Sequence, residues 1–202
     1  MRIGIDFDNT IAGYDQAFVG LAVEWGLIPD GAAKTKTEVR DTLRAQDGGE
    51  HDWQRLQGRI YGAELARADL IDGVGDFLTQ ARQRGDEVFI VSHKTEFGHF
   101  DPDRVNLRDA ARQWMTDQGF FSSEGYAIDP AQVYFLPTRE EKVAKIADLG
   151  LDWFIDDLPE VLNADGFPKT VERVLFANAA AVQDGPYKVK AHWSDIQALI
   201  LS

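Results

Sequence analysis

Near the start of the 202-residue chain stands the stretch Ile3-Gly4-Ile5-Asp6-Phe7-Asp8-Asn9-Thr10, which decides the fold that we predict. A short apolar run that ends in polar residues is typical of a buried strand. Because side chains alternate along a strand, Asp6 and Asp8 are expected to project to the same side. Ligands of open α/β sheets bind at the carboxyl ends of the strands. We therefore expect both carboxylates to face a ligand.

Farther along the chain, short apolar runs alternate with segments of helical spacing. The apolar runs, many of them β-branched or aromatic, cover residues 3–7, 88–91, 133–136, 153–155 and 171–176. Apolar residues recur with helical spacing over residues 75–84, 107–118 and 140–149. This alternation predicts an α/β fold, with a doubly wound, mostly parallel, Rossmann-like sheet.

Residues 14–70 break the alternation, because they contain turns and helical spacing but no convincing strand. Helices are expected over 17–25, 38–45 and 53–66. We predict a catalytic core formed by 1–13 and 71–202, with 14–70 inserted as a small helical cap. The alternative is that these helices simply pack on the sheet, as in any α/β domain.

A second acidic pair, Asp156-Asp157, follows the apolar run Trp153-Phe154-Ile155. If the two acidic strand ends are neighbours, four carboxylates converge. Two such charges about 4 Å apart repel by roughly 4 kcal/mol at an effective dielectric constant of 20. The group must therefore take up protons or hold a cation. Hard oxygen ligands, with no cysteine and no clustered histidine, favour Mg²⁺ over zinc.

These motifs resemble those of the haloacid dehalogenase (HAD) superfamily. Residues 3–11 resemble its motif I, and Phe89-Ile90-Val91-Ser92 resembles motif II, a strand that ends in Ser or Thr. Residues 153–157 resemble motif IV in its Asp-Asp form. The motifs stand in the family's order, and an Asp at position 72 replaces the proline that the family often has there. The resemblance implies the HAD-like fold and a phosphatase-type hydrolase.

The resemblance also implies a role for each acidic residue. Asp6 would be the nucleophile that forms an aspartyl-phosphate, and Asp8 would be the general acid and then the general base. Family dehalogenases lack this second Asp, so its presence favours phosphoryl transfer to water. Mg²⁺ would be held by the Asp6 side chain, the Asp8 backbone carbonyl and Asp156, with Asp157 close by or acting through water.

Four polar residues are predicted to contact the substrate phosphate: Thr10, Ser92, His93 and Lys142. A serine at a strand end is also typical of a helix cap, so Ser92 depends on its place between motifs I and IV. His93 begins the segment 93–95, whose backbone N–H groups and side chains are in reach of the phosphate or the leaving group. The following loop, residues 96–106, either borders the site or is a surface connection.

Motif III of the family is a lysine, which either Lys142 or Lys145 can supply. Thr138 and Glu141 fit a capping box, so Lys142 falls in the first helical turn and can reach the carboxyl edge of the sheet. Lys145 lies almost one turn deeper, and helix geometry favours Lys142. The alternative is that both lysines are solvated.

Five side chains of the predicted cap are candidates for leaving-group contacts, although aromatic residues at helical spacing are more often part of a core. They are Trp25, Trp53, Arg55, Arg59 and Tyr61.

Composition narrows the partners. The net charge of −13 disfavours binding to duplex nucleic acid or to an anionic membrane. No apolar window is long enough to span a membrane, and no signal-peptide pattern is present, so a cytoplasmic location is expected. We expect a small phosphorylated substrate, such as a nucleotide or sugar phosphate, hydrolysed with Mg²⁺.

Two other functions remain open. One is a non-catalytic binding or scaffold protein with a HAD-like fold, although degenerate relatives usually lose Asp6- or Asp8-type residues. The other is phosphonate hydrolysis or phosphoryl transfer to a second substrate. Phosphonate cleavage in the family uses a cap lysine as a Schiff base, for which Lys34 and Lys36 are available, and neither lies in an apolar stretch of sequence.

Overall fold

The computed structural model describes residues 1–178 and 185–202, and it divides into two compact units. We call the first the sheet unit, which comprises residues 1–11, 70–94 and 118–202. The second, the helical unit, comprises residues 12–69 and 95–117. The chain therefore passes between the units four times.

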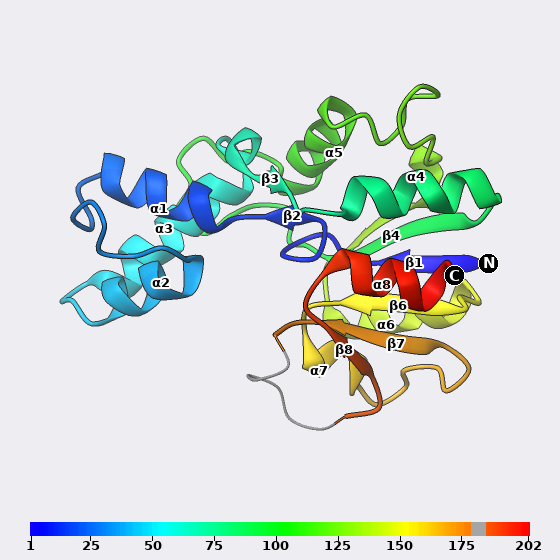
Figure 1. Cartoon of the computed structure of the whole chain (residues 1–202). Helices are drawn as coiled ribbons and strands as arrows, with labels where there is room; N and C mark the ends of the chain where they lie inside the picture. The colour runs from blue at the N-terminus through cyan, green and yellow to red at the C-terminus, as the bar shows by residue number, and fades with distance from the viewer. Residues whose placement is uncertain (179–184) are drawn as a thin grey trace. The chain divides into compact units, whose positions relative to one another are not determined.

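The sheet unit contains a six-stranded parallel sheet with the strand order β5-β4-β1-β6-β7-β8 (Figure 1). The strands are β1 (Arg2–Ile5), β4 (Glu87–His93), β5 (Val133–Leu136), β6 (Trp153–Asp156), β7 (Glu172–Phe176) and β8 (Lys188–Lys190). The predicted doubly wound α/β fold is confirmed. The chain leaves β1 toward β4 and β5, and later returns past β1 to β6, so β1 lies at the point where the strand order reverses.

Helices cover both faces of this sheet. They are α4 (Val74–Arg84), α6 (Arg139–Asp148), α7 (Pro159–Leu162) and α8 (Trp193–Ile200), with the short η2 (Pro130–Gln132) before β5. Side chains of α6 and α7 share one apolar cluster with Phe89, Val91 and Phe154 of the sheet. Helices α4 and α8 contact each other on the opposite face, where the rings of Phe77 and Trp193 pack edge to face.

The centre of the sheet brings the ends of β1 and β6 together. Gly4 pairs with Phe89 on one side and with Phe154 on the other. A Cβ at Gly4 would lie 2.4 Å from Leu151 Cδ1 and 2.6 Å from Phe154 Cδ2, so only glycine allows this close packing. Beyond the strand proper, the Asp6 amide donates a hydrogen bond to Ile155 O at 2.9 Å. Asp6, the first residue after β1, is thereby held beside the last residues of β6.

The helical unit is built from α1 (Asp15–Glu24), α2 (Lys36–Arg44), α3 (Gly49–Tyr61), η1 (Leu65–Arg67) and α5 (Leu107–Asp117). The two-residue strands β2 (Ala12–Gly13) and β3 (Asp69–Leu70) pair where the chain leaves and re-enters the sheet unit. Its core includes the rings of Phe18 and Trp53, whose centroids are 5.0 Å apart. No described helix has both the length and the apolar character needed to cross a membrane.

The structure divides the chain differently from the sequence prediction in one segment. We assigned all of 71–202 to the core, but residues 95–117 belong to the helical unit. The reason is packing: α5 contacts α3 and η1, and the buried Trp114 donates a hydrogen bond from Nε1 to Ala68 O at 3.0 Å. Local helical spacing could not reveal which unit the apolar face of α5 covers.

Candidate active site

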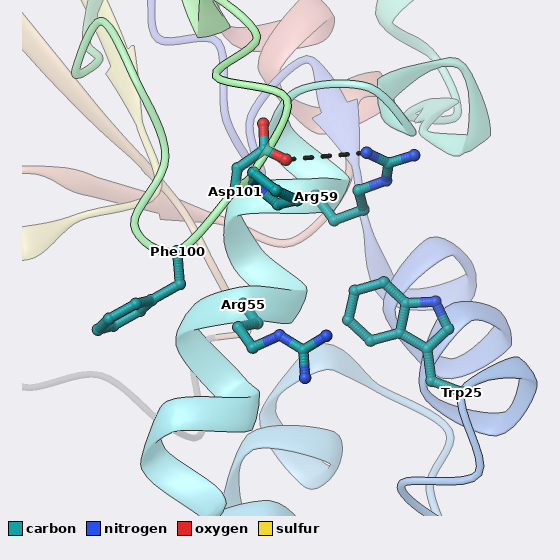
Figure 2. A pocket seen from close by; sticks show the side chains of 6 residues that line it. Trp25, Arg55, Arg59, Phe100 and Asp101 are labelled. Carbon is teal, nitrogen blue, oxygen red and sulfur yellow. Dashed lines mark ion pairs between the residues drawn. The ribbon is translucent and has the colours of Figure 1, made fainter.

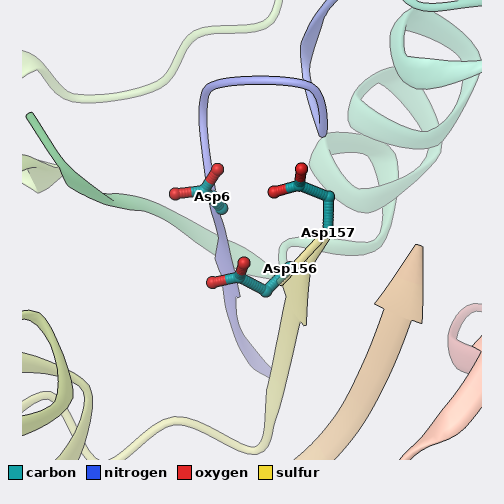
Figure 3. Close-up of side chains that lie close together, drawn as sticks. All are labelled: Asp6, Asp156 and Asp157. Atoms are coloured by element: carbon teal, nitrogen blue, oxygen red, sulfur yellow. The ribbon is translucent and has the colours of Figure 1, made fainter. Parts of the chain in front are cut away.

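Three carboxylates meet at the carboxyl ends of β1 and β6 (Figure 3). Asp6 follows β1, Asp156 is the last residue of β6, and Asp157 comes directly after it. One oxygen from each lies within 4.8 Å of the other two. Asp6 and Asp156 are buried, and Asp157 is half-buried. This is the arrangement that oxygen-ligated cations require.

A buried lysine bridges two of these carboxylates. Lys142 Nζ donates hydrogen bonds to Asp6 Oδ1 and to Asp156 Oδ2, both at 2.6 Å. Lys142 lies in the first turn of α6, because Thr138 accepts a hydrogen bond from the Glu141 amide and starts the helix there. The structure thus brings Lys142, and not Lys145, to the carboxylates, since Lys145 Nζ lies 5.0 Å from the ring centre of Tyr134.

Burial and charge act in opposite directions on this group. Burial alone would lower the pKa of Lys142, but the carboxylates of Asp156 and Asp6 outweigh it and raise that pKa, so the ammonium is retained. Burial raises the pKa of Asp156 to about 6, and the adjacent Asp6 adds to the rise while Lys142 opposes it. The lysine alone therefore does not fully compensate the two acids.

The fourth carboxylate takes a different place from the one we expected. We expected four carboxylates to converge, with Asp8 holding the ion through its backbone carbonyl, and the structure pairs the Asp8 side chain with Lys94. Lys94 Nζ lies 2.9 Å from Asp8 Oδ1 and 2.8 Å from Asp8 Oδ2. The ammonium offers Asp8 the compensation that a metal would otherwise supply. Within the described part of the chain, the cluster that could hold an ion consists of Asp6, Asp156 and Asp157.

The sequence matched no family model and no curated protein. Among solved structures, a HAD-superfamily hydrolase from Ehrlichia chaffeensis aligns with a TM-score of 0.58 at 11 % identity, covering 99 % of this chain and 95 % of that one. A HAD family hydrolase from Deinococcus radiodurans with bound phosphate and sodium gives 0.57 at 15 % identity, with 98 % and 94 % covered.

The chain has the HAD-superfamily fold. The Mycobacterium tuberculosis protein tyrosine kinase A also aligns, with a TM-score of 0.62 at 15 % identity, covering 98 % of this chain and 96 % of that one. Dehalogenases are among the other matches. At these identities the likeness establishes the HAD fold, whereas the chemistry must be argued from the side chains.

Apart from Lys142, the predicted phosphate-contacting residues occupy three different environments in this HAD fold. Thr10 is buried, and its Oγ1 makes no hydrogen bond within the described part of the chain. Ser92 is buried near the end of β4, beside Phe135 of β5. His93 is exposed, and its Nε2 lies 2.9 Å from Pro137 O in the loop after β5. Its observed hydrogen bond thus ties His93 to that loop.

Lys94 is the residue of this site that the prediction did not single out. It was included only in the segment 93–95. A signal was present, because Lys94 follows Ser92 by two positions and side chains two apart on a strand project to the same side. An ammonium at that position is directed to the same edge of the sheet as Ser92. Only the pairing of β1 with β4 shows that Asp8 is its partner.

The cap candidates separate into core and cavity residues. Trp53 is buried and Tyr61 packs against Tyr14, so both belong to the core of the helical unit. Trp25, Arg55 and Arg59 line a cavity of about 100 Å³ (Figure 2). The other lining residues are Phe100, Asp101 and Pro102.

The loop 96–106 therefore has a structural role within the helical unit. The fully buried Asp101 side chain accepts hydrogen bonds from the amides of Asp103 and Val105, and it lies 3.7 Å from Arg59 Nη1 (Figure 2). The Arg55 guanidinium carbon lies 5.3 Å from the ring centre of Trp25. A cavity of this size accommodates one ring or a small polar group, not a whole ligand.

The environment of Lys36 differs from our expectation. We found no apolar stretch of sequence around Lys36, yet its Nζ lies 6.0, 5.6 and 5.4 Å from the ring centres of Tyr14, Phe18 and Tyr61. These rings come from α1, α3 and the segment before α1, which sequence spacing does not place together. Aromatic faces stabilise the charged form of an amine.

Proposed function

We propose that this chain is a Mg²⁺-dependent phosphohydrolase that cleaves a small phosphomonoester through a phosphoryl group carried transiently on Asp6. The observation that carries the proposal is the cluster of Asp6, Asp156 and Asp157 with Lys142 bridging two of them. A buried cluster of charged groups lowers the stability of the fold. We therefore infer that the chain retains this cluster because it serves catalysis.

The residues present fit a divalent cation. Asp6, Asp156 and Asp157 each offer a carboxylate oxygen within 4.8 Å of the other two. The pKa of Asp156 stays raised although Lys142 pairs with both Asp6 and Asp156. The ligands are hard oxygens, which suit Mg²⁺. Mg²⁺ would be held by Asp6, Asp156, Asp157 and the Asp8 carbonyl, and would neutralise charge on the nucleophile and the phosphoryl oxygens.

In the first step an oxygen of Asp6 attacks phosphorus and the bond from phosphorus to the leaving oxygen breaks. Lys142 binds Asp6 Oδ1, so the other carboxylate oxygen is the one available for attack. Protonated Asp8 gives its proton to the leaving oxygen, which departs as an alcohol. Ser92 and Thr10 supply hydroxyl groups for the phosphoryl oxygens, and the unsatisfied Oγ1 of Thr10 suits that role.

In the second step Asp8, now a carboxylate, takes a proton from water. The water oxygen attacks phosphorus, and the bond to Asp6 breaks, which releases phosphate and restores the nucleophile. The same carboxyl group thus serves as acid and then as base. A dehalogenase has no leaving oxygen to protonate, so the presence of Asp8 supports the phosphatase rather than that alternative.

One similar structure supports the proposal. The Deinococcus radiodurans hydrolase was crystallised with bound phosphate and sodium, so that HAD fold holds phosphate and a cation. For phosphonate hydrolysis, a neutral amine is needed to form the Schiff base. The three rings around Lys36 favour its ammonium form, which argues against that alternative.

A phosphate-release screen over small phosphomonoesters, with Mg²⁺ and with EDTA, tests the function. We expect release that requires Mg²⁺ and that falls by at least about a thousandfold in Asp6→Asn. Asp165→Asn, which changes an exposed carboxylate of the same unit, is the matched control and should retain activity. Release that persists in Asp6→Asn or in EDTA would exclude this mechanism. No release from any ester would favour the scaffold alternative.

A further inference from the structure

The second lysine of the active site, Lys94, is buried like the first but pairs with a different acid, Asp8. Lys94 is only 4 % exposed. Its backbone amide donates a hydrogen bond to Leu136 O at 2.9 Å, which continues the pairing of β4 with β5. The main chain at Lys94 is therefore fixed by the sheet. Its Nζ lies 5.3 Å from the ring centre of Phe7, between Asp6 and Asp8 in sequence.

The contact between Lys94 and Asp8 constrains the carboxylate in a specific way. The ammonium donates one hydrogen bond to each carboxylate oxygen, at 2.9 and 2.8 Å. A carboxylate has about four lone-pair directions, and these two hydrogen bonds use one on each oxygen. A symmetric contact of this kind restricts rotation of the side chain. Asp8 itself is half-buried, which leaves one side open.

We propose that Lys94 is the positioning residue that holds Asp8 in place for proton transfer to the leaving oxygen and from water. This inference rests on the function proposed above. Lys94 acts through Asp8, and it does not bind the phosphoryl group. Its importance therefore depends on how much the leaving oxygen needs a proton.

The contrast with Lys142 makes this dependence measurable. Lys142 contacts the nucleophile Asp6, so its loss should slow the attack on every ester. Lys94 contacts the acid Asp8 through both carboxylate oxygens, so its loss should slow the release of an alkoxide far more than the release of a nitrophenolate. The nitrophenolate leaves as an anion without help, whereas the alkoxide does not.

The experiment compares kcat/KM of the full chain and of Lys94→Met on p-nitrophenyl phosphate and on the alkyl phosphate that the screen finds best. We expect the loss on the alkyl ester to exceed the loss on the aryl ester at least about tenfold, since acid catalysis typically contributes 10²–10⁴-fold. The change should lie in kcat, with KM and the inhibition constant of inorganic phosphate unaltered. Lys169→Met, at an exposed lysine of the same unit, is the matched control.

A double-mutant cycle then shows whether Lys94 acts through Asp8. Asp8→Asn should give the same preference for the aryl ester, and adding Lys94→Met to it should cause no further loss. Lys94→Arg, which keeps a cation that can contact both oxygens, should restore part of the alkyl activity. If Lys94→Met does not fold, the alkyl and aryl esters are compared in Lys94→Arg instead.

Equal losses on the two esters, additive losses in the cycle, or weaker inhibition by phosphate would each overturn the role of Lys94. An active wild-type chain with any of these results leaves the proposed function intact. An inactive wild-type chain removes the proposed function, and this inference with it.

Discussion

The two units of this chain treat their charged side chains in opposite ways. In the sheet unit, Lys142 and Asp156 are 1 % and 0 % exposed and form hydrogen bonds at 2.6 Å. In the helical unit, Arg59 also contacts several carboxylates, but its side chain is 29 % exposed and that of its partner Asp103 is 58 % exposed. The first network is buried, whereas the second is partly exposed, with Asp101 as its one buried carboxylate.

The difference shows where the chain sacrifices stability. Moving an ammonium and a carboxylate out of water costs several kcal/mol each, and their attraction does not always repay it. Surface pairs cost little and contribute little. Stability therefore does not explain why this chain keeps a buried network of acids and lysines at the ends of its parallel strands. We take the reason to be catalysis, and three measurements test the contrast.

The largest expected effect is on stability after Lys142→Met. The change leaves Asp6 and Asp156 buried without their cation, so we expect the free energy of unfolding to fall by about 3–5 kcal/mol. Urea denaturation of the wild type and of Lys142→Met, both without metal, measures this difference in the free energy of unfolding.

Arg59→Met is the matched change in the helical unit. It also removes a cation with several carboxylate partners, and we expect a loss of about 1 kcal/mol or less, because Asp103 is exposed and the buried Asp101 keeps its hydrogen bonds from two backbone amides. Equal losses for the two variants would show that burial does not distinguish the networks.

The next effect concerns pH and Mg²⁺. In the metal-free chain the pKa of Asp156 is raised to about 6, so proton uptake stabilises the fold at low pH, and this contribution is lost as the pH rises through 6. Mg²⁺ replaces the proton. We therefore expect saturating Mg²⁺ to raise the melting temperature by several degrees at pH 7.5 and clearly less at pH 5.

Asp156→Asn provides the control for this measurement. The amide does not titrate. The metal-free wild type should lose stability between pH 5 and 7.5, and the metal-free variant should not. Mg²⁺ should have little effect on the variant at either pH. A Mg²⁺ effect that is larger at pH 5 than at pH 7.5 would contradict the assignment of Asp156.

The smallest effect is expected for Thr10→Val. Thr10 Oγ1 is buried without a hydrogen bond in the described residues, so replacing the hydroxyl with a methyl group should stabilise the fold by about 1 kcal/mol. If this hydroxyl serves the phosphate, the same variant binds inorganic phosphate more weakly. Thermal unfolding and calorimetric titration measure the two quantities. A destabilised variant would mean that Oγ1 has a partner within the fold.

Much of the sheet could be predicted because its signals are local. The apolar runs at 133–136 and 153–155 fall on β5 and β6, and the acids that follow β1 and β6 lie together. The first-turn position of Lys142 followed from the capping residues Thr138 and Glu141. Each of these predictions depends on a few consecutive residues and on a general rule of parallel sheets.

The features that could not be predicted depend on contacts between distant segments. The pairing of Asp8 with Lys94 joins residues 86 apart in the sequence. Strand β8, with the sequence Lys188-Val189-Lys190, is short and charged, as edge strands are, and carries no apolar run. The face on which α5 packs is fixed by η1 and α3, which lie more than forty residues earlier.

The four passages of the chain between the units have a consequence for protein engineering. The helical unit consists of two separate pieces, so it cannot be removed as one continuous deletion. Excising residues 12–69 alone would remove the helices against which α5 packs. It would expose Ala111, Trp114 and Met115, which are buried in the intact chain. A minimal version of the sheet unit would need two splices, one joining Ile11 to Leu70 and one joining Lys94 to Gln118.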